Sequence, residues 1–163
     1  MDTLEIEKQI AKQNITLWIK EAEEKADKLW NKDQEQVKLF FKNNDERKSI
    51  GIISSEDMIV FDGIEDYHLY ADKSYLIDHY LNRHYDNRLF ENIQNILDQR
   101  TDIYFDINQN SIGFVKRNDK LVDCLFVKAI DNKLVLFAST YKQPASRLQN
   151  KRYKKITPAK KQE

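Results

Sequence analysis

The chain has 163 residues, of which 40% are hydrophobic and 33% charged, and its formal net charge at pH 7 is zero. This composition excludes a disordered chain and favours one folded domain with a charged surface. No apolar run approaches the ~20 residues of a membrane-spanning helix, and the acidic start lacks the features of a signal peptide, so we expect a cytoplasmic protein without a membrane partner.

Residues 2–44 are expected to be helical. Apolar side chains such as Leu17, Trp18 and Trp30 recur at roughly helical spacing between Lys, Glu and Gln. Asn14 and the segment 31–33 are candidate breaks, because Asn and Asp favour caps and turns. The pattern therefore predicts two or three helices, packed on the rest of the domain or available to a partner.

The period changes from residue 49 onward. Two short β-branched runs, 50–53 and 58–61, predict a small hairpin or edge strands. Helical spacing then returns from Lys73 to about His84, and Leu89, Ile93 and Leu97 mark a second helix.

Strand patterns follow at 103–105, 111–116, 121–130 and 134–141, separated by Asn- and Asp-rich turns. Asp131-Asn132 between two apolar runs is typical of a tight hairpin and favours an antiparallel meander. The only cysteine, Cys124, lies within an apolar run and is expected to fill core space. The sequence thus predicts an α+β fold in which N-terminal helices precede two helices packed on a four-stranded antiparallel sheet.

The expected organisation is a helical region at 1–46, an α+β domain at 47–145 and a basic tail at 146–163. Residues 1–70 contain ten Lys/Arg and sixteen Asp/Glu, a net of −6, whereas 71–163 contain seventeen and eleven, a net of +6. Such positive charge can contact phosphates without reading sequence, and a solvated tail is the alternative. The cationic candidates for nucleic-acid contact are Lys116, Arg117, Lys142, Arg147, Lys151, Arg152, Lys154 and Lys155.

The segment 79–84 places His79, Arg83 and His84 within six residues. Histidine titrates near neutrality and arginine carries a fixed charge suited to phosphate, so the segment suggests RNA cleavage without a metal. On a regular helix His79 and Arg83 share a face, whereas His84 points away from them. Either the helix ends near Arg83 and His84 turns inward, or one histidine is structural; a half-buried, structural His79 is the other alternative.

The order of the H-x-x-x-R-H helix, the second helix, and strands reading SIGFVKR, LVDCLFVKA and KLVLFASTYK resembles the phage-associated branch of the barnase–EndoU–colicin–RelE-like nucleases, over about residues 70–145. The resemblance implies metal-independent RNA cleavage, often in toxins or mobile elements, with transfer RNA as one candidate substrate. It points to His79, Arg83 and His84, to Lys116 or Arg117, and to Thr140 and Tyr141. We expect His79 as the base, Arg83 on phosphate, and Thr140 or Tyr141 as a positioning or acid group.

Other chemistries have less support. The chain contains no C-x-x-C, H-E-x-x-H or glycine-rich phosphate loop, so neither a metal nor a nucleotide cofactor is expected. The competing hypothesis is a non-catalytic mobile-element protein. It would bind a nucleic acid, an inhibitor or another protein through the N-terminal helices and the basic tail.

Overall fold

The computed structural model describes residues 2–28, 34–82 and 87–157. The chain opens with α1 (Thr3–Lys28) and α2 (Gln34–Asn43), followed by β1 (Arg47–Ile52), the 3-10 helix η1 (Asp57–Val60) and β2 (His68–Asp72). The next elements are α3 (Lys73–Asn82), α4 (Asn87–Glu91), α5 (Ile93–Gln99), β3 (Asp102–Asp106), β4 (Ser111–Asn118), β5 (Leu121–Ile130) and β6 (Leu134–Pro144). A second 3-10 helix, η2 (Ala145–Gln149), then leads to β7 (Tyr153–Thr157).

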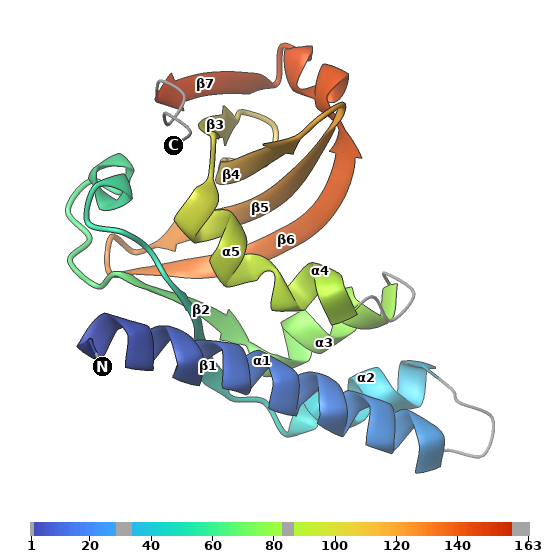
Figure 1. The fold of residues 1–163 in the computed structure, drawn as a ribbon. Helices are drawn as coiled ribbons and strands as arrows, with labels where there is room; N and C mark the ends of the chain where they lie inside the picture. Colours follow the sequence, from blue (N-terminus) through green and yellow to red (C-terminus); the bar gives the residue numbers. More distant parts are fainter. Residues whose placement is uncertain (1, 29–33, 83–86, 158–163) are drawn as a thin grey trace.

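The strands form one seven-stranded sheet in the order β1-β2-β6-β5-β4-β3-β7 (Figure 1). The meander β3–β6 is antiparallel, and its β5–β6 turn contains Asp131 and Asn132 at φ 53° and 56°, which Asp and Asn tolerate better than most residues. The pairing of β2 with β6 is parallel, so the sheet is mixed.

The protein is α+β, but the expectation of two helices on a four-stranded antiparallel sheet is wrong. Strands β1 and β2 extend the sheet beyond β6, and β7 extends it beyond β3. The sequence of β7, with Lys154 and Lys155, looks like a solvated tail. It joins the sheet because main-chain hydrogen bonding at an edge does not depend on apolar side chains.

Two local expectations in the N-terminal part also change. Helix α1 continues through Asn14, whose side-chain amide donates 2.8 Å to the carbonyl of Ser49 in β1 and so ties the helix to the sheet. The other candidate break, 31–33, lies outside the described residues. The run 58–61 belongs largely to η1, so the strand that pairs with β1 is β2.

The main apolar core lies between the helices and one side of the sheet, here called the helix-covered face. Helix α5 lies in front of the strands in Figure 1, α3 and α4 follow below it, and α1 runs past β1. Side chains of this core include Trp18, Leu76, Phe90, Phe114 and Phe137, all 3% exposed or less. Burial of this apolar surface is the main favourable contribution to folding.

The opposite side of the sheet, here called the open face, carries a smaller apolar cluster. It consists of Tyr104, Val115, Val122, Cys124, Phe126 and Leu148. Leu148 comes from η2, so this short helix covers part of the open face. Burial raises the pKa of the Cys124 thiol to about 12, so this group remains a protonated core thiol at neutral pH.

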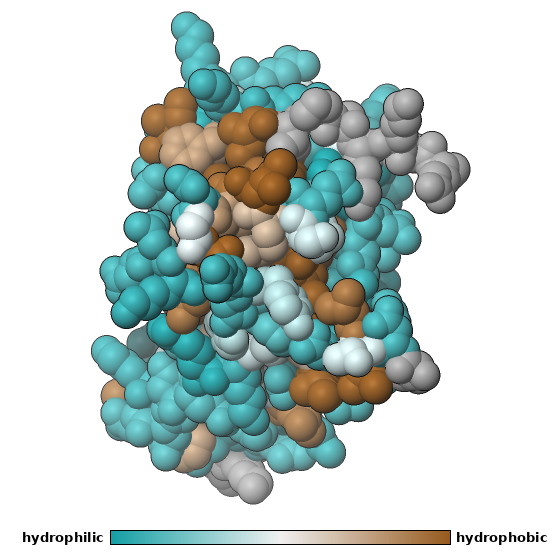
Figure 2. Space-filling view, turned by 90° about the vertical axis from the view of Figure 1, so that its left-hand side faces the viewer, coloured by the Kyte–Doolittle hydropathy of each residue, from teal (hydrophilic) through white to brown (hydrophobic). Residues whose placement is uncertain are grey.

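The face of the molecule shown in Figure 2 is mainly polar. In Figure 2, small groups of hydrophobic side chains lie among hydrophilic ones on the side that faces left in Figure 1. Within the described residues, no helix combines the length and the apolar character needed to span a membrane.

Candidate functional site

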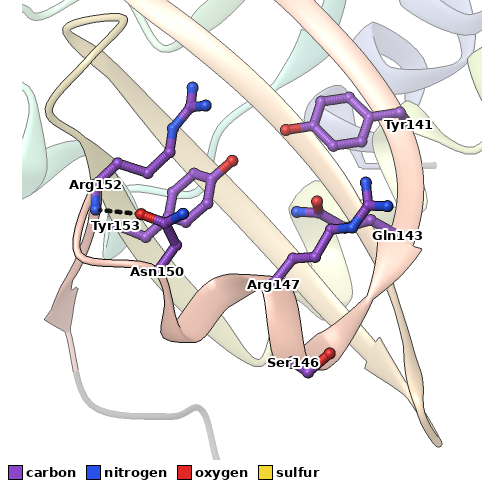
Figure 3. A pocket seen from close by; sticks show the side chains of 7 residues that line it. All are labelled: Tyr141, Gln143, Ser146, Arg147, Asn150, Arg152 and Tyr153. Carbon is purple, nitrogen blue, oxygen red and sulfur yellow. Dashed lines mark hydrogen bonds between the residues drawn. The ribbon is translucent and has the colours of Figure 1, made fainter.

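A cavity of about 610 Å³ lies on the open face, between β6, η2 and the start of β7 (Figure 3). We call it the phenol–arginine pocket; it is lined by Tyr141, Gln143, Ser146, Arg147, Asn150, Arg152 and Tyr153. The period-two alternation of β6 directs Tyr141 and Gln143 to this side of the sheet. The turn after η2 then brings Arg152 and Tyr153 opposite them.

A third aromatic ring, that of Phe126, packs against the two tyrosines of the pocket. Phe126 stacks against Tyr141, with ring centroids 5.7 Å apart, and lies 6.0 Å from the ring of Tyr153. The Phe126 ring lies next to Gly113, where an added Cβ would come within 2.5 Å of a ring carbon. Because Gly113 has no side chain, the Phe126 ring can pack close to strand β4 while it contacts both phenols.

The two phenols face each other across the pocket, and their oxygens point toward each other in Figure 3. Burial, and then hydrogen bonding with Tyr153, raise the pKa of Tyr141 well above its ordinary value. Tyr141 is therefore protonated at neutral pH and suited to donate a hydrogen bond.

The two arginines of the pocket differ in how they are held. The Arg152 side chain donates to both carboxylate oxygens of Asp106, at 3.1 and 2.6 Å, and its guanidinium lies 5.0 Å from the Tyr153 ring. Asp106 is only 2% exposed, so Arg152 is fixed by a buried anion. Arg147 is exposed on η2 and makes no salt bridge with any described residue, so its charge is available to a ligand.

A second buried carboxylate fixes other cations on the open face. Asp102 accepts 2.8 Å from Arg117 and lies 3.1 Å from the ammonium of Lys155. Burial acts to raise the pKa of Asp102, but the hydrogen bonds from Arg117 and Lys155 lower it below its ordinary value. Both β3 carboxylates therefore hold cations in place, and Asp102 stays ionised near neutral pH.

The remaining cationic candidates lie elsewhere. Lys116, Asp123 and Lys142 form a cross-strand row on the helix-covered side, where Lys142 lies 3.4 Å from Asp123 and Lys116 donates 2.7 Å to Asn95 of α5. Lys151 and Lys154 are exposed beside the pocket segment, in the turn after η2 and in β7. The structure thus separates Lys116 and Lys142 from Arg117, Arg147, Arg152 and Lys155.

The histidine segment does not meet the phenol–arginine pocket in the described residues. His79 is half-buried on α3 and its ring packs against Tyr75, Phe90 and Phe137 of the helix-covered face, with centroids 6.2, 6.3 and 5.7 Å apart. Thr140 is fully buried and its hydroxyl donates to the carbonyl of Cys124. Arg83 and His84 lie outside the described residues.

The structure therefore places Thr140 and Tyr141 on opposite faces of the sheet. Strand alternation contains this signal, because neighbouring residues of a strand point to opposite sides. The same alternation places Gln143 on the same face as Tyr141, although Gln143 was not among the predicted site residues. Ser146, Asn150 and Tyr153 were also missed, because the segment was interpreted as a tail.

The fold and the pocket define an α+β protein with a phenol- and guanidinium-lined cavity on the sheet face away from its helices. No known protein family, curated protein or solved structure matches the chain. Among the described residues, no group of three or more His, Cys, Asp or Glu side chains is arranged to hold a metal ion.

Proposed function

We propose that this protein is a metal-independent endoribonuclease of the toxin type, and that the phenol–arginine pocket is its active centre. The observation that carries the proposal is the joining of two phenols and two guanidiniums in one solvent-accessible cavity. Guanidinium groups suit a phosphodiester, and phenols supply hydrogen-bond donors and surfaces on which a base can stack.

The reaction is an attack of the ribose 2′-oxygen on the adjacent phosphorus. A new O2′–P bond forms, the P–O5′ bond breaks, and the products are a 2′,3′-cyclic phosphate and a 5′-hydroxyl. Arg147 and Arg152 stabilise the charge that develops on the phosphoryl oxygens. Tyr141, whose phenol is protonated at neutral pH, donates its proton to the departing O5′, and water takes the proton of the 2′-hydroxyl.

Non-catalytic RNA binding at the same pocket is the second candidate. It is favoured by a specific observation: the seven lining residues include neither an imidazole nor a carboxylate that could accept the 2′-hydroxyl proton. A partner protein has a separate candidate surface in this case. Ile6, Ile10 and Leu17 recur at helical spacing along α1 and are 43–55% exposed.

The test is cleavage of total RNA by the purified protein in excess chelator. We expect discrete wild-type fragments that carry a cyclic phosphate. In Tyr141→Phe the rate should fall by a factor of about 10² or more, the range lost with a general acid. His79→Ala is the matched control from the other face, and a folded His79→Ala protein should retain cleavage.

Two results would change the assignment. Loss of cleavage in a folded His79→Ala variant, with Tyr141→Phe active, would return the active centre to the histidine segment. RNA that is bound but left intact by the wild type would favour the binding protein. Fluorescence anisotropy of a labelled oligoribonucleotide measures that binding independently of cleavage.

A further inference from the structure

A second cavity, of about 460 Å³, lies on the other side of η2. Its walls include Tyr104 of β3, Arg117 of β4, Lys120 of the β4–β5 turn, and Leu148 and Gln149 of η2. Ser146 lines both this cavity and the phenol–arginine pocket, so the two hollows are neighbours separated by η2.

The chemistry of this second cavity repeats that of the first. Arg117 is held in place by Asp102 at 2.8 Å and by the phenol oxygen of Tyr104 at 3.2 Å, so its guanidinium has a fixed direction. Lys120 is exposed and forms no salt bridge with the described residues. A fixed guanidinium, a phenol and an available ammonium group suit a phosphate with its attached nucleoside.

We propose that the second cavity is a subsite for a nucleotide next to the one held in the phenol–arginine pocket. The protein then binds a single-stranded RNA segment that crosses η2. This inference rests on the proposed function and extends it to the form of the substrate.

The position of η2 between the two cavities favours a single strand over a duplex. Leu148 is packed into the open-face cluster and anchors η2 between the hollows. The bases of a single strand can separate and enter neighbouring hollows, whereas paired and stacked bases cannot. Sequence-tolerant contacts of this kind combine cationic groups with aromatic surfaces.

The experiment measures binding of labelled 2′-O-methyl oligouridines of two, four and six nucleotides, which lack the nucleophilic hydroxyl and stay intact. Lys120→Gln tests the subsite, and Lys133→Gln is the matched control. Lys133 is also exposed and follows β5, whereas Lys120 precedes it, so the two lysines lie at opposite ends of that strand.

We expect wild-type affinity to rise with length and Lys120→Gln to lose much of this rise. A plot of the logarithm of the association constant against the logarithm of the salt concentration has a negative slope. This slope should become shallower by about 0.7 in Lys120→Gln, as for loss of one phosphate contact to a single strand, and should stay unchanged in Lys133→Gln. Equal effects of the two substitutions, or affinity independent of length, would overturn the subsite while leaving the proposed function intact. A wild type that binds none of these oligonucleotides and leaves RNA intact would overturn both.

A matching duplex decides the form of the substrate. Weaker binding of the duplex than of the single strand at equal length supports the proposal. Equal binding with the same sensitivity to Lys120→Gln would overturn the single-strand assignment.

Discussion

The two faces of the sheet are stabilised by different interactions. The helix-covered face packs strands against helices through a continuous apolar core, in which His79 contacts aromatic rings. The open face has a small apolar cluster bordered by the buried carboxylates Asp102 and Asp106, each bound to cations. The two sides of the same strands therefore differ in kind: one packs an apolar core, and the other joins buried carboxylates to cations that border a cavity.

The largest expected effect is on the helix-covered face. Phe114 is fully buried and its ring centroid lies 6.2 Å from that of Phe61. Phe114→Ala should lower the free energy of unfolding by about 3–5 kcal/mol, because it removes buried apolar surface and leaves a cavity. Urea denaturation measures this loss, and a loss below about 1 kcal/mol would show that the core is not the main source of stability.

Substitutions of the two pocket arginines should differ in their effect on the free energy of unfolding and agree in their effect on RNA binding. Arg152→Ala should cost about 1–3 kcal/mol of unfolding free energy, because buried Asp106 loses its cationic partner. Arg147→Ala should change stability by less than about 0.5 kcal/mol, since Arg147 is exposed. Both should weaken RNA binding by anisotropy, and a folded Arg147→Ala variant with wild-type affinity would contradict its role.

Gly113 tests the aromatic support of the pocket. Gly113→Ala should displace the Phe126 ring, cost about 1–3 kcal/mol through overpacking and weaken RNA binding. Gly63→Ala is the matched control. Gly63 has φ +80° and nothing within 4 Å of an added Cβ, so alanine there adds backbone strain of about 1–2 kcal/mol. Gly63 is not among the residues that line the pocket. Equal effects of the two substitutions on RNA affinity would mean that general destabilisation, and not the position of Phe126, controls binding.

The smallest effect concerns pH. The pKa of Asp102 is lowered in the folded state, so its contribution to stability is complete above its ordinary pKa of 3.8 and is lost as pH falls through the folded value. In Asp102→Asn this titration is absent. The stability difference between wild type and variant, measured by urea denaturation, should therefore shrink as pH is lowered below about 4. A difference that is constant from pH 6 to pH 2.5 would contradict the assignment.

Periodic segments were the part of the fold that sequence could predict. The N-terminal helical region and the β3–β6 meander have period-3.6 and period-two patterns, and the meander has Asp- or Asn-rich turns, although the break expected at Asn14 is absent. Strand β2 alternates over only five residues, and the edge strand β7 is rich in lysine, so neither was predicted. Their places depend on pairing with distant segments, β6 and β3, which local sequence does not encode.

The candidate site was predictable only in part. Tyr141, Arg147 and Arg152 were selected from the sequence and line one cavity, whereas His79 and Thr140 lie toward the helix-covered core. Tyr153 could not be selected, because its meeting with Tyr141 depends on the turn after η2.

The order of elements also sets the order of synthesis. Every lining residue of the phenol–arginine pocket comes from Tyr141 onward, in the last strand of the meander, in η2, in the turn that follows η2 and in β7. Nascent chains begin to fold from their N-terminal side. The helices and most of the sheet can therefore be in place on the ribosome while the pocket does not yet exist, and the pocket is complete only after β7 has emerged from the exit tunnel and paired with β3.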